Sequence, residues 1–374
     1  MLTTLAVENY RSLRALRVRL DRLNVITGAN GSGKSSLYRV LRLLADFARN
    51  GAVAGLAREG GLDSTLFAGP GRSGPNVPLA LKLGFAAHDF GYAAELGVPI
   101  PGKSMFNRDP EIKSEAAWAG PVLRPSTALA ERGGPVVRLR GEGGGWGAVP
   151  LTIKPFDSML SEIADPQRAP DLLVLRERMR SWRFYDHLRT DSAAPARASQ
   201  VGTRTMALAH DGADMAAALQ TILEIGDATA LAETIDHAFP GSRIEIVNRE
   251  GRFELQLHQH KLFRALGTAE LSDGTMRYLL LAAALLSPRP PELLVLNEPE
   301  TSLHPELLSP LGRLIAKTAE DTQIVVVTHS EELIGVIDEY AARLRMIELV
   351  KREGATTVAG QSRLDEPPWY WPDR

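Results

Sequence analysis

The stretch GANGSGKS, from Gly28 to Ser35, constrains the fold of this chain more than any other part of the sequence. It follows a run of strand-forming residues, LNVIT, and precedes a segment in which apolar residues recur at helical spacing. The pattern G-x-x-x-x-G-K-[ST] between a strand and a helix is typical of a loop that holds phosphate with its backbone N–H groups and the helix N-terminus. The sequence therefore predicts an α/β fold with a nucleotide-phosphate loop.

Each residue type in this phosphate loop has an expected role. Gly31 and Gly33 let backbone N–H groups close on the β-phosphate, and Lys34 reaches the β- and γ-phosphates. The hydroxyl of Ser35 is expected to face Mg²⁺. The predicted nucleotide-binding residues of the loop are Asn30, Gly31, Ser32, Gly33, Lys34, Ser35 and Ser36.

Composition excludes several other classes of protein. The 374 residues carry 43 Lys and Arg against 45 Asp and Glu, so the net charge of −2 does not by itself call for a nucleic-acid partner. The absence of cysteine excludes disulfides, thiolate zinc sites and cysteine nucleophiles. No signal-peptide core and no apolar run of membrane-spanning length occur, so we expect a cytoplasmic protein without a membrane partner.

Periodicity divides the N-terminal half into three parts. Residues 2–28 have the pattern of short strands, and residues 35–50 that of a helix with Gly51 at its C-terminal cap. Glycine and proline interrupt strand-like pieces between about residues 61 and 150, which predicts an antiparallel β insertion. Residues 171–188 are expected to form a helix whose apolar face comprises Leu172, Leu175, Met179, Trp182 and Tyr185.

The C-terminal half alternates helices and strands. Helices are predicted for DMAAALQTILEI, ATALAETIDHAF and TMRYLLLAAALLS, and a hairpin for RIEIVNREGRFELQLH. The strands LLVLNE and QIVVVTHS enclose a helix over residues 306–319.

Three further motifs lie at the ends of these elements. LSDGT places Ser272 and Gly274 at a helix start, where they form either a second anion-binding end or an ordinary helix cap. The strand LLVLNE ends on the amide Asn297 and the acid Glu298. His329 ends the next strand, where it is either a surface residue or a group that senses a γ-phosphate and polarises the attacking water.

In this order, the motifs resemble the RecF/SMC branch of the ABC-type ATPases, specifically the small RecF-like "AAA family ATPase" proteins. The segments VENYRSLRALRVRLDRLNVITGANGSGKSS, ELSDGTMRYLLLAAALL and LNEPETSLHPELL carry the resemblance. It implies a P-loop NTPase of ABC/RecF-like head fold, with a mixed β-sheet lobe over residues 1–165 and 290–374 and a helical signature lobe over residues 166–289. It also implies ATP and Mg²⁺ as cofactors, and an ATP-dependent homodimer in which the phosphate loop of one chain faces Ser272 and Gly274 of the other.

The resemblance assigns the catalytic roles. Glu298 would be the general base for the attacking water, with Lys34 and His329 beside the phosphates. Asn297 stands where the family has an aspartate that holds Mg²⁺ through a water, so Ser35 and Asn297 are the expected metal-side residues. The amide lacks the aspartate's charge, and losing such a supporting group typically costs ~10–100-fold in metal affinity or activity. We therefore expect a slow ATPase.

The chain also departs from family members in other places. No glutamine precedes Gln167, so Ser158, Ser161 or Gln167 would have to replace the usual glutamine loop. No long coiled coil is predicted. Only 45 residues follow His329, too few for the nuclease domain of OLD-type relatives.

Partners are suggested by the resemblance rather than by charge. DNA is the expected partner, in repair or phage defence, with a nuclease or other effector acting in trans. Two basic stretches are candidates for DNA contact, one with Arg11, Arg14, Arg17 and Arg19 and one with Arg176, Arg178, Arg180 and Arg183. The alternatives are a non-catalytic ATP-gated dimer that positions a partner protein and, further off, a transporter ATPase subunit.

Overall fold

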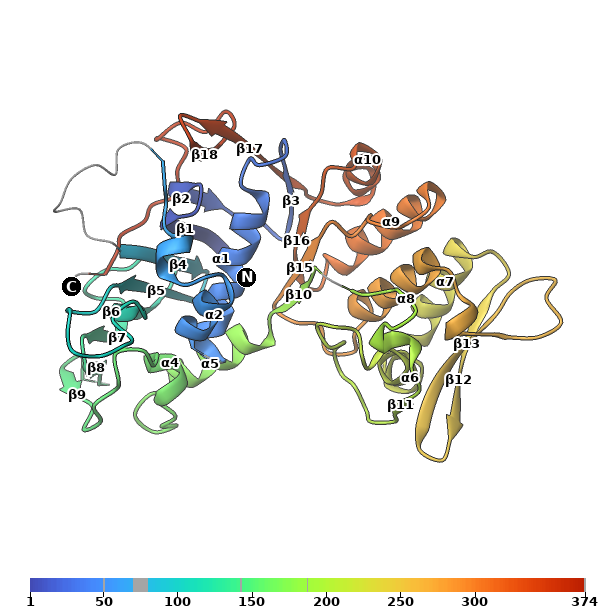
Figure 1. Cartoon of the computed structure of the whole chain (residues 1–374), viewed down its shortest axis with the longest axis horizontal. Helices are drawn as coiled ribbons and strands as arrows, with labels where there is room; N and C mark the ends of the chain where they lie inside the picture. Colours follow the sequence, from blue (N-terminus) through green and yellow to red (C-terminus); the bar gives the residue numbers. More distant parts are fainter. Residues whose placement is uncertain (50, 70–79, 142, 187, 373–374) are drawn as a thin grey trace. The chain divides into compact units, whose positions relative to one another are not determined.

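The chain forms two compact units in a computed structural model that describes residues 1–49, 51–69, 80–141, 143–186 and 188–372. The first unit comprises Met1–Asp21, Ile26–Trp182 and Met346–Arg374, and the second comprises residues 22–25 and Arg183–Arg345 (Figure 1). These units differ from the two predicted lobes, because residues 290–345 pack with the helices that precede them. Each unit therefore contains one part of the predicted site.

An antiparallel sheet of order β2-β1-β4-β5-β6-β7-β8-β9 forms the body of the first unit. Its strands are β1 (Leu2–Tyr10), β2 (Leu13–Arg19), β4 (Ala80–Ala87), β5 (Phe90–Gly97), β6 (Glu111–Ala119), β7 (Ala128–Gly133), β8 (Val136–Arg140) and β9 (Trp146–Ala148). Strands β4 to β9 are the predicted antiparallel insertion, and β4 joins it to the N-terminal strands by pairing with β1.

Five helices and one hairpin complete what the structure describes of the first unit. They are α1 (Lys34–Ala48), α2 (Ala52–Arg58), α3 (Leu62–Thr65), α4 (Met159–Glu162), α5 (Pro170–Ser181) and the hairpin of β17 (Arg345–Arg352) and β18 (Ala355–Val358). Helix α1 buries its apolar residues against β4, α4 and α5. The residue after its last turn is Arg49, whereas Gly51, with φ of 83°, precedes α2 and donates its N–H to the carbonyl of Asp46.

The predicted helix over residues 171–188 was wrong beyond Ser181. Helix α5 ends there, and residues Arg183–Tyr185 form strand β10. Strand β10 runs parallel to β15 (Leu293–Asn297), with Tyr185 opposite Leu296. Pairing with a strand that is distant in the sequence overrides the local helical pattern, and Trp182 and Tyr185 are buried in either arrangement.

The second unit combines a parallel sheet with helices. Its strands in the order β10-β15-β16-β3 are β10 (Arg183–Tyr185), β15 (Leu293–Asn297), β16 (Gln323–Val327) and β3 (Leu23–Thr27), the last of which begins in this unit. Its helices are α6 (Met215–Ile225), α7 (Ala228–Ala238), α8 (Asp273–Leu285), α9 (Leu308–Thr318), α10 (Glu331–Tyr340) and the short 3-10 helices η1 (Pro195–Arg197), η2 (Thr268–Glu270) and η3 (Pro305–Leu307). Leu296 and Val326 belong to the same buried cluster as the apolar residues of α8 and α9, which therefore cover one face of the sheet (Figure 1).

A small antiparallel sheet completes the second unit. Its strands are β11 (Gln200–Val201), β12 (Arg243–Arg249), β13 (Arg252–His258) and β14 (Leu266–Gly267). The predicted hairpin of β12 and β13 is confirmed, with Glu250 and Gly251 at positive φ in its turn. No helix among the described residues is both long enough and apolar enough to cross a membrane.

Two glycines of the first sheet make room for tryptophan rings, one from Trp118 on the neighbouring strand β6 and one from Trp369 near the C-terminus. A Cβ at Gly91 would lie 2.1 Å from the indole of Trp118, and a Cβ at Gly84 would lie 2.5 Å from that of Trp369. The two indoles meet edge to face with centroids 5.6 Å apart. The C-terminal segment is thereby packed onto the sheet, where the indole N–H of Trp371 donates to the carboxylate of Glu8 at 2.6 Å.

We predict that Gly91→Ala destabilises the first unit by about 1–3 kcal/mol, because the methyl group overlaps the buried Trp118 ring. Urea unfolding followed by tryptophan fluorescence measures the change. The matched control is Gly133→Ala in β7, where a Cβ meets no atom within 4 Å. Equal stabilities of the two variants would contradict this account of the glycine.

Candidate functional site

The phosphate loop joins β3 to α1 and has the backbone that its glycines predict. Gly28, Gly31 and Gly33 have φ of 138°, 76° and 111°. No side chain caps the N-terminus of α1, and its first turn carries no acid, so its N–H groups remain available to an anion. Asn30 and Ser35 are exposed, and Ser36 is half-buried. The loop therefore has the shape and the free donors of a phosphate site.

Lys34 is held within this loop. Its ammonium donates to the carbonyl of Gly28 at 2.6 Å and lies 3.3 Å from that of Ala29. The residue is only 7% exposed. The loop's positive charge is thus fixed beside its backbone rather than extended into solvent.

The C-terminal hairpin supports the loop from behind. The hydroxyl of the buried Thr356 donates to the carbonyl of Ser32 at 2.7 Å and lies 2.8 Å from the hydroxyl of Ser12. A Cβ at Gly28 would come within 2.3 Å of the carbonyl oxygen of Leu349, and one at Gly33 equally close to the hydroxyl of Thr356. No sequence signal points to Thr356, because threonine is common in strands.

In the second unit, the end of β15 carries the predicted acid in an unusual backbone conformation. Glu298 has φ of 48°, a left-handed value that costs a non-glycine residue roughly 1–2 kcal/mol. Its N–H donates to the carbonyl of Val327 at 2.8 Å, and its carbonyl accepts from Arg277 at 3.1 Å. The Glu298 side chain is 43% exposed. A strained backbone thus presents the carboxylate to solvent.

His329 and Glu300 lie beside Glu298. The imidazole Nδ1 of His329 is 3.8 Å from a carboxylate oxygen of Glu298 and 4.0 Å from one of Glu300. Glu300 also accepts from the hydroxyl of Thr328 at 2.6 Å and from the N–H of His329 at 3.3 Å. The structure therefore brings the predicted Glu298 and His329 together. It adds Glu300, which the sequence analysis missed although the second acid in NEPET was visible.

Asn297, directly before Glu298, offers an unsatisfied acceptor. Its side-chain oxygen is buried and has no hydrogen-bond partner. Buried acceptors of this kind usually have one, so the position suits a water or a polar ligand. Because residue 297 is an asparagine, this position carries no negative charge.

The signature segment, Leu271–Thr275, begins α8. The Ser272 hydroxyl accepts from the N–H of Thr275 at 3.2 Å, so this serine does cap the helix. A Cβ at Gly274 would lie 2.9 Å from the carbonyl oxygen of Ser302, which requires a small residue where the helix meets the loop after β15. Arg197 fixes the segment by bonding the carbonyl of Leu271 and pairing with Asp273, each at 2.8 Å.

Each unit, taken by itself, carries an oxygen donor of the kind that a magnesium ion takes beside a nucleotide. Among the described residues, no group of three or more His, Cys, Asp or Glu could hold a metal alone. Mg²⁺ prefers oxygen donors, keeps several waters and takes one or two protein ligands beside substrate phosphates. The exposed hydroxyl of Ser35 and the unsatisfied oxygen of Asn297 are donors of this type.

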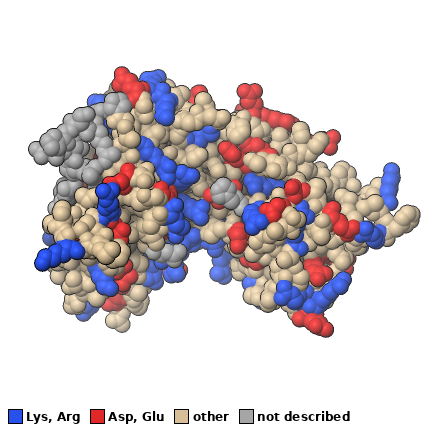
Figure 2. Space-filling view, in the orientation of Figure 1, with Lys and Arg blue, Asp and Glu red and all other residues tan. Residues whose placement is uncertain are grey.

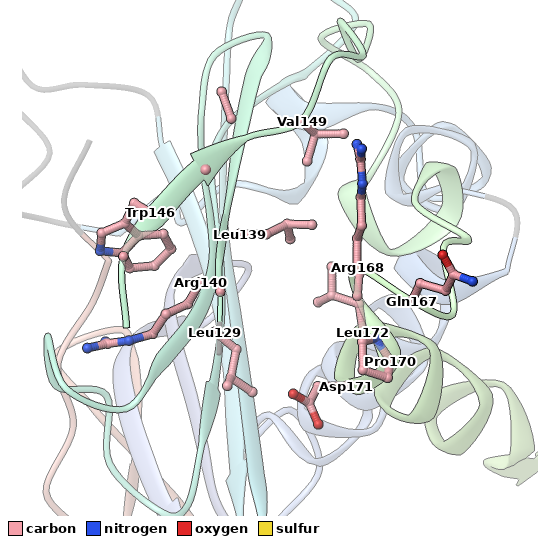
Figure 3. Close-up of a pocket in the computed structure, with 15 residues that line it drawn as sticks. Leu129, Leu139, Arg140, Trp146, Val149, Gln167, Arg168, Pro170, Asp171 and Leu172 are labelled. Atoms are coloured by element: carbon pink, nitrogen blue, oxygen red, sulfur yellow. The ribbon is translucent and has the colours of Figure 1, made fainter. Parts of the chain in front are cut away.

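The residues considered for the glutamine loop lie elsewhere in the first unit. Ser158 is fully buried and donates to the carboxylate of Glu115 at 2.5 Å. Ser161 bonds the carbonyl of Ser158. Gln167 stands with Arg168 at the start of α5, on the wall of a cavity of about 770 Å³ whose opposite wall includes Leu139 (Figure 3). None of the residues lining this cavity belongs to the phosphate loop.

The two basic stretches are largely paired with acids. Arg11 pairs with Glu59 at 2.8 Å, and Arg17 lies 3.4 Å from Glu366. In the second stretch, Arg178 pairs with Asp89. Trp182 and Phe184 are buried, as expected if these aromatics serve the core. On the face that Figure 2 shows, both units carry exposed Lys and Arg as well as Asp and Glu side chains.

We predict that Thr356→Val weakens ATP binding about fivefold, since one hydrogen bond to the loop, worth about 1 kcal/mol, is lost. Calorimetric titration measures the dissociation constant. Thr357→Val is the matched control, because the neighbouring hydroxyl has no partner. Thr356→Ser should restore affinity, and equal affinities of the two valine variants would contradict the supporting role.

Two family models match parts of this chain. Residues 155–335 match the family described as "AAA domain, putative AbiEii toxin, Type IV TA system", and residues 1–67 match the family described as "AAA ATPase domain". The first segment contains the Asn297–His329 group and the signature segment, and the second contains the phosphate loop.

Solved structures agree on the fold. The chain is similar to an Smc head bound to the C-winged helix domain of ScpA, at 14% identity and a TM-score of 0.53, with 97% of this chain and 98% of that one covered. It is also similar to a Pyrococcus furiosus Smc head bound to the C-terminal domain of ScpA, at 12% identity and a TM-score of 0.52, with 96% and 95% covered. Two segments of the chain are thus similar to AAA-type ATPase domains, and the solved structures show that the chain has the P-loop fold of an SMC head.

Proposed function

We propose that this protein binds ATP with Mg²⁺, hydrolyses it slowly, and forms a homodimer around the nucleotide. The observation that carries this proposal is the Glu298–His329 pair, 3.8 Å apart at the ends of adjacent parallel strands, in a chain with a complete phosphate loop. A carboxylate beside an imidazole can accept a proton from water and remain oriented while it does so.

Each residue contributes one part of the reaction. The loop N–H groups and Lys34 bind the phosphates, and Ser35 and Asn297 would hold the hydrated Mg²⁺, which neutralises phosphate charge when bound. Glu298 takes the proton from the attacking water, and His329 orients that water against the terminal phosphate. Asn297 supplies shape and an acceptor without charge, which supports slow turnover.

The dimer follows from the signature segment. Ser272 and Gly274 stand at a helix N-terminus, whose N–H groups and dipole attract phosphate. In the proposed dimer this end meets the γ-phosphate bound by the other chain. The same closure would serve the alternative function, an ATP-gated switch in which hydrolysis is incidental.

For the biological process, we propose DNA repair or phage defence, with DNA or a partner protein as the target of the closed dimer. The Smc heads of similar fold are described in complex with ScpA domains, which supports a protein partner for such a head. The paired arginines of both basic stretches give DNA less support.

The first test of this function is Glu298→Gln. The amide retains the size of the side chain but cannot accept the proton, so turnover should fall on the order of 10²–10⁴-fold while ATP stays bound. Light scattering with ATP should then show a stable dimer. Glu306→Gln, at an acid 88% exposed in the same unit, is the control and should behave as wild type.

Two further results decide the interpretation. Lys34→Ala should abolish ATP binding and therefore the dimer. A Glu298→Gln protein as fast as wild type would reject Glu298 as the base, and one that stays monomeric with ATP bound would reject the dimer.

The second test restores the missing acid. Asn297→Asp adds a charge beside the expected hydrated Mg²⁺ without a change in size, so turnover should rise by up to about 10–100-fold. The Mg²⁺ concentration for half-maximal rate should fall. A rate unchanged at every Mg²⁺ concentration would place the slow step in dimer closure or product release instead.

A further inference from the structure

The second unit contains a buried arginine, Arg277. Arg277 lies on α8, five positions after Ser272, and is only 7% exposed. Arginine is rarely buried to this degree without a specific partner. Burial lowers the pKa of its guanidinium, while the nearby carboxylates of Glu300, Asp186 and Glu298 act in the opposite direction.

The contacts of Arg277 are to backbone rather than to these acids. One terminal nitrogen donates to the carbonyl of Leu188 at 3.0 Å, and the other donates to the carbonyl of Glu298 at 3.1 Å. Its Nε is buried without a hydrogen-bond partner. A single side chain therefore joins helix α8, the segment after β10 and the loop after β15.

The contact with Glu298 falls on a residue with a strained backbone conformation. Glu298 has a left-handed φ of 48°, and the carbonyl of Val327 holds its N–H. Arg277 holds its carbonyl, so both peptide groups of Glu298 are fixed. The direction of a side chain depends on its backbone dihedral angles, and the half-buried Glu298 side chain is held only in part by packing.

The start of α8 touches the same loop a second time. Gly274 approaches the carbonyl of Ser302 so closely that a Cβ would lie 2.9 Å from it, and Ser302 also has positive φ, at 65°. The signature segment and the loop of Glu298 are thus joined at two points, Gly274 to Ser302 and Arg277 to Glu298.

We infer that Arg277 is a positioning residue, which holds Glu298 in its hydrolytic orientation and transmits contacts made at Ser272 to it. The inference rests on the proposed function, since it assigns Glu298 the role of base. Arg277 itself takes no proton and contacts no nucleotide. It acts through the carbonyl of Glu298.

The test compares Arg277→Met and Arg277→Lys with wild type. Methionine retains much of the buried volume but donates no hydrogen bond, so kcat should fall on the order of 10–100-fold, while KM and the ATP dissociation constant stay within about twofold. Lysine can bond one of the two carbonyls and should recover part of kcat. Arg252→Lys, at an arginine that bonds Ser199 in the same unit, is the matched control.

A double variant separates positioning from general stability. If Arg277 acts through Glu298, Arg277→Met combined with Glu298→Gln should be no slower than Glu298→Gln alone, because effects within one unit of catalysis are not additive. Additive losses of kcat in the double variant would overturn the inference. An unchanged kcat in both Arg277→Met and Arg277→Lys would overturn it as well. Should the methionine variant fail to fold, the lysine variant and its double carry the same comparison.

The two hypotheses fail differently. A Glu298→Gln protein with wild-type turnover would reject the proposed function and this inference together. A slow Glu298→Gln protein with normal Arg277 variants would reject only the positioning role.

Discussion

The hydrogen bond from Thr356 to the carbonyl of Ser32 joins the last hairpin of the first unit to its phosphate loop. Together with the close approach of Leu349 to Gly28, it holds the loop in the backbone conformation that its glycines permit. A loop preorganised in this way need not be ordered when phosphate binds, which saves conformational entropy. The loop is therefore a product of both ends of the chain, although its pattern occupies eight consecutive residues.

In the second unit, too, contacts between residues distant in the sequence hold the backbone of a predicted site residue. Parallel strands β15 and β16 place Glu298 and His329 at neighbouring strand ends, the usual location of functional groups in such sheets. The strained Glu298 backbone is secured by Val327 on one side and Arg277 on the other. Arg277 lies on the helix that Ser272 caps, so helix α8 connects the signature segment to the candidate base Glu298.

The sequence predicted much of this local geometry because its signals are local. The strand, glycine pattern and helix of the phosphate loop lie within about 25 residues, and each has its own periodicity or backbone requirement. The prediction failed at residues 182–185, where helical spacing continued but strand β10 formed. There the parallel pairing with β15 decided the outcome, and no local pattern encodes a partner more than a hundred residues away.

The sequence by itself determined the α/β class, the phosphate loop, and the amide–acid pair Asn297 and Glu298 at a strand end, because each is set by adjacent residues. Only the tertiary structure decided that Thr356 supports Ser32 across 324 positions, that Glu300 joins Glu298 and His329, and that Arg277 reaches the carbonyl of Glu298. Threonine, glutamate and arginine are common in strands and on helices. Their roles arise only when folding removes them from water and leaves a specific backbone group as the available hydrogen-bond partner.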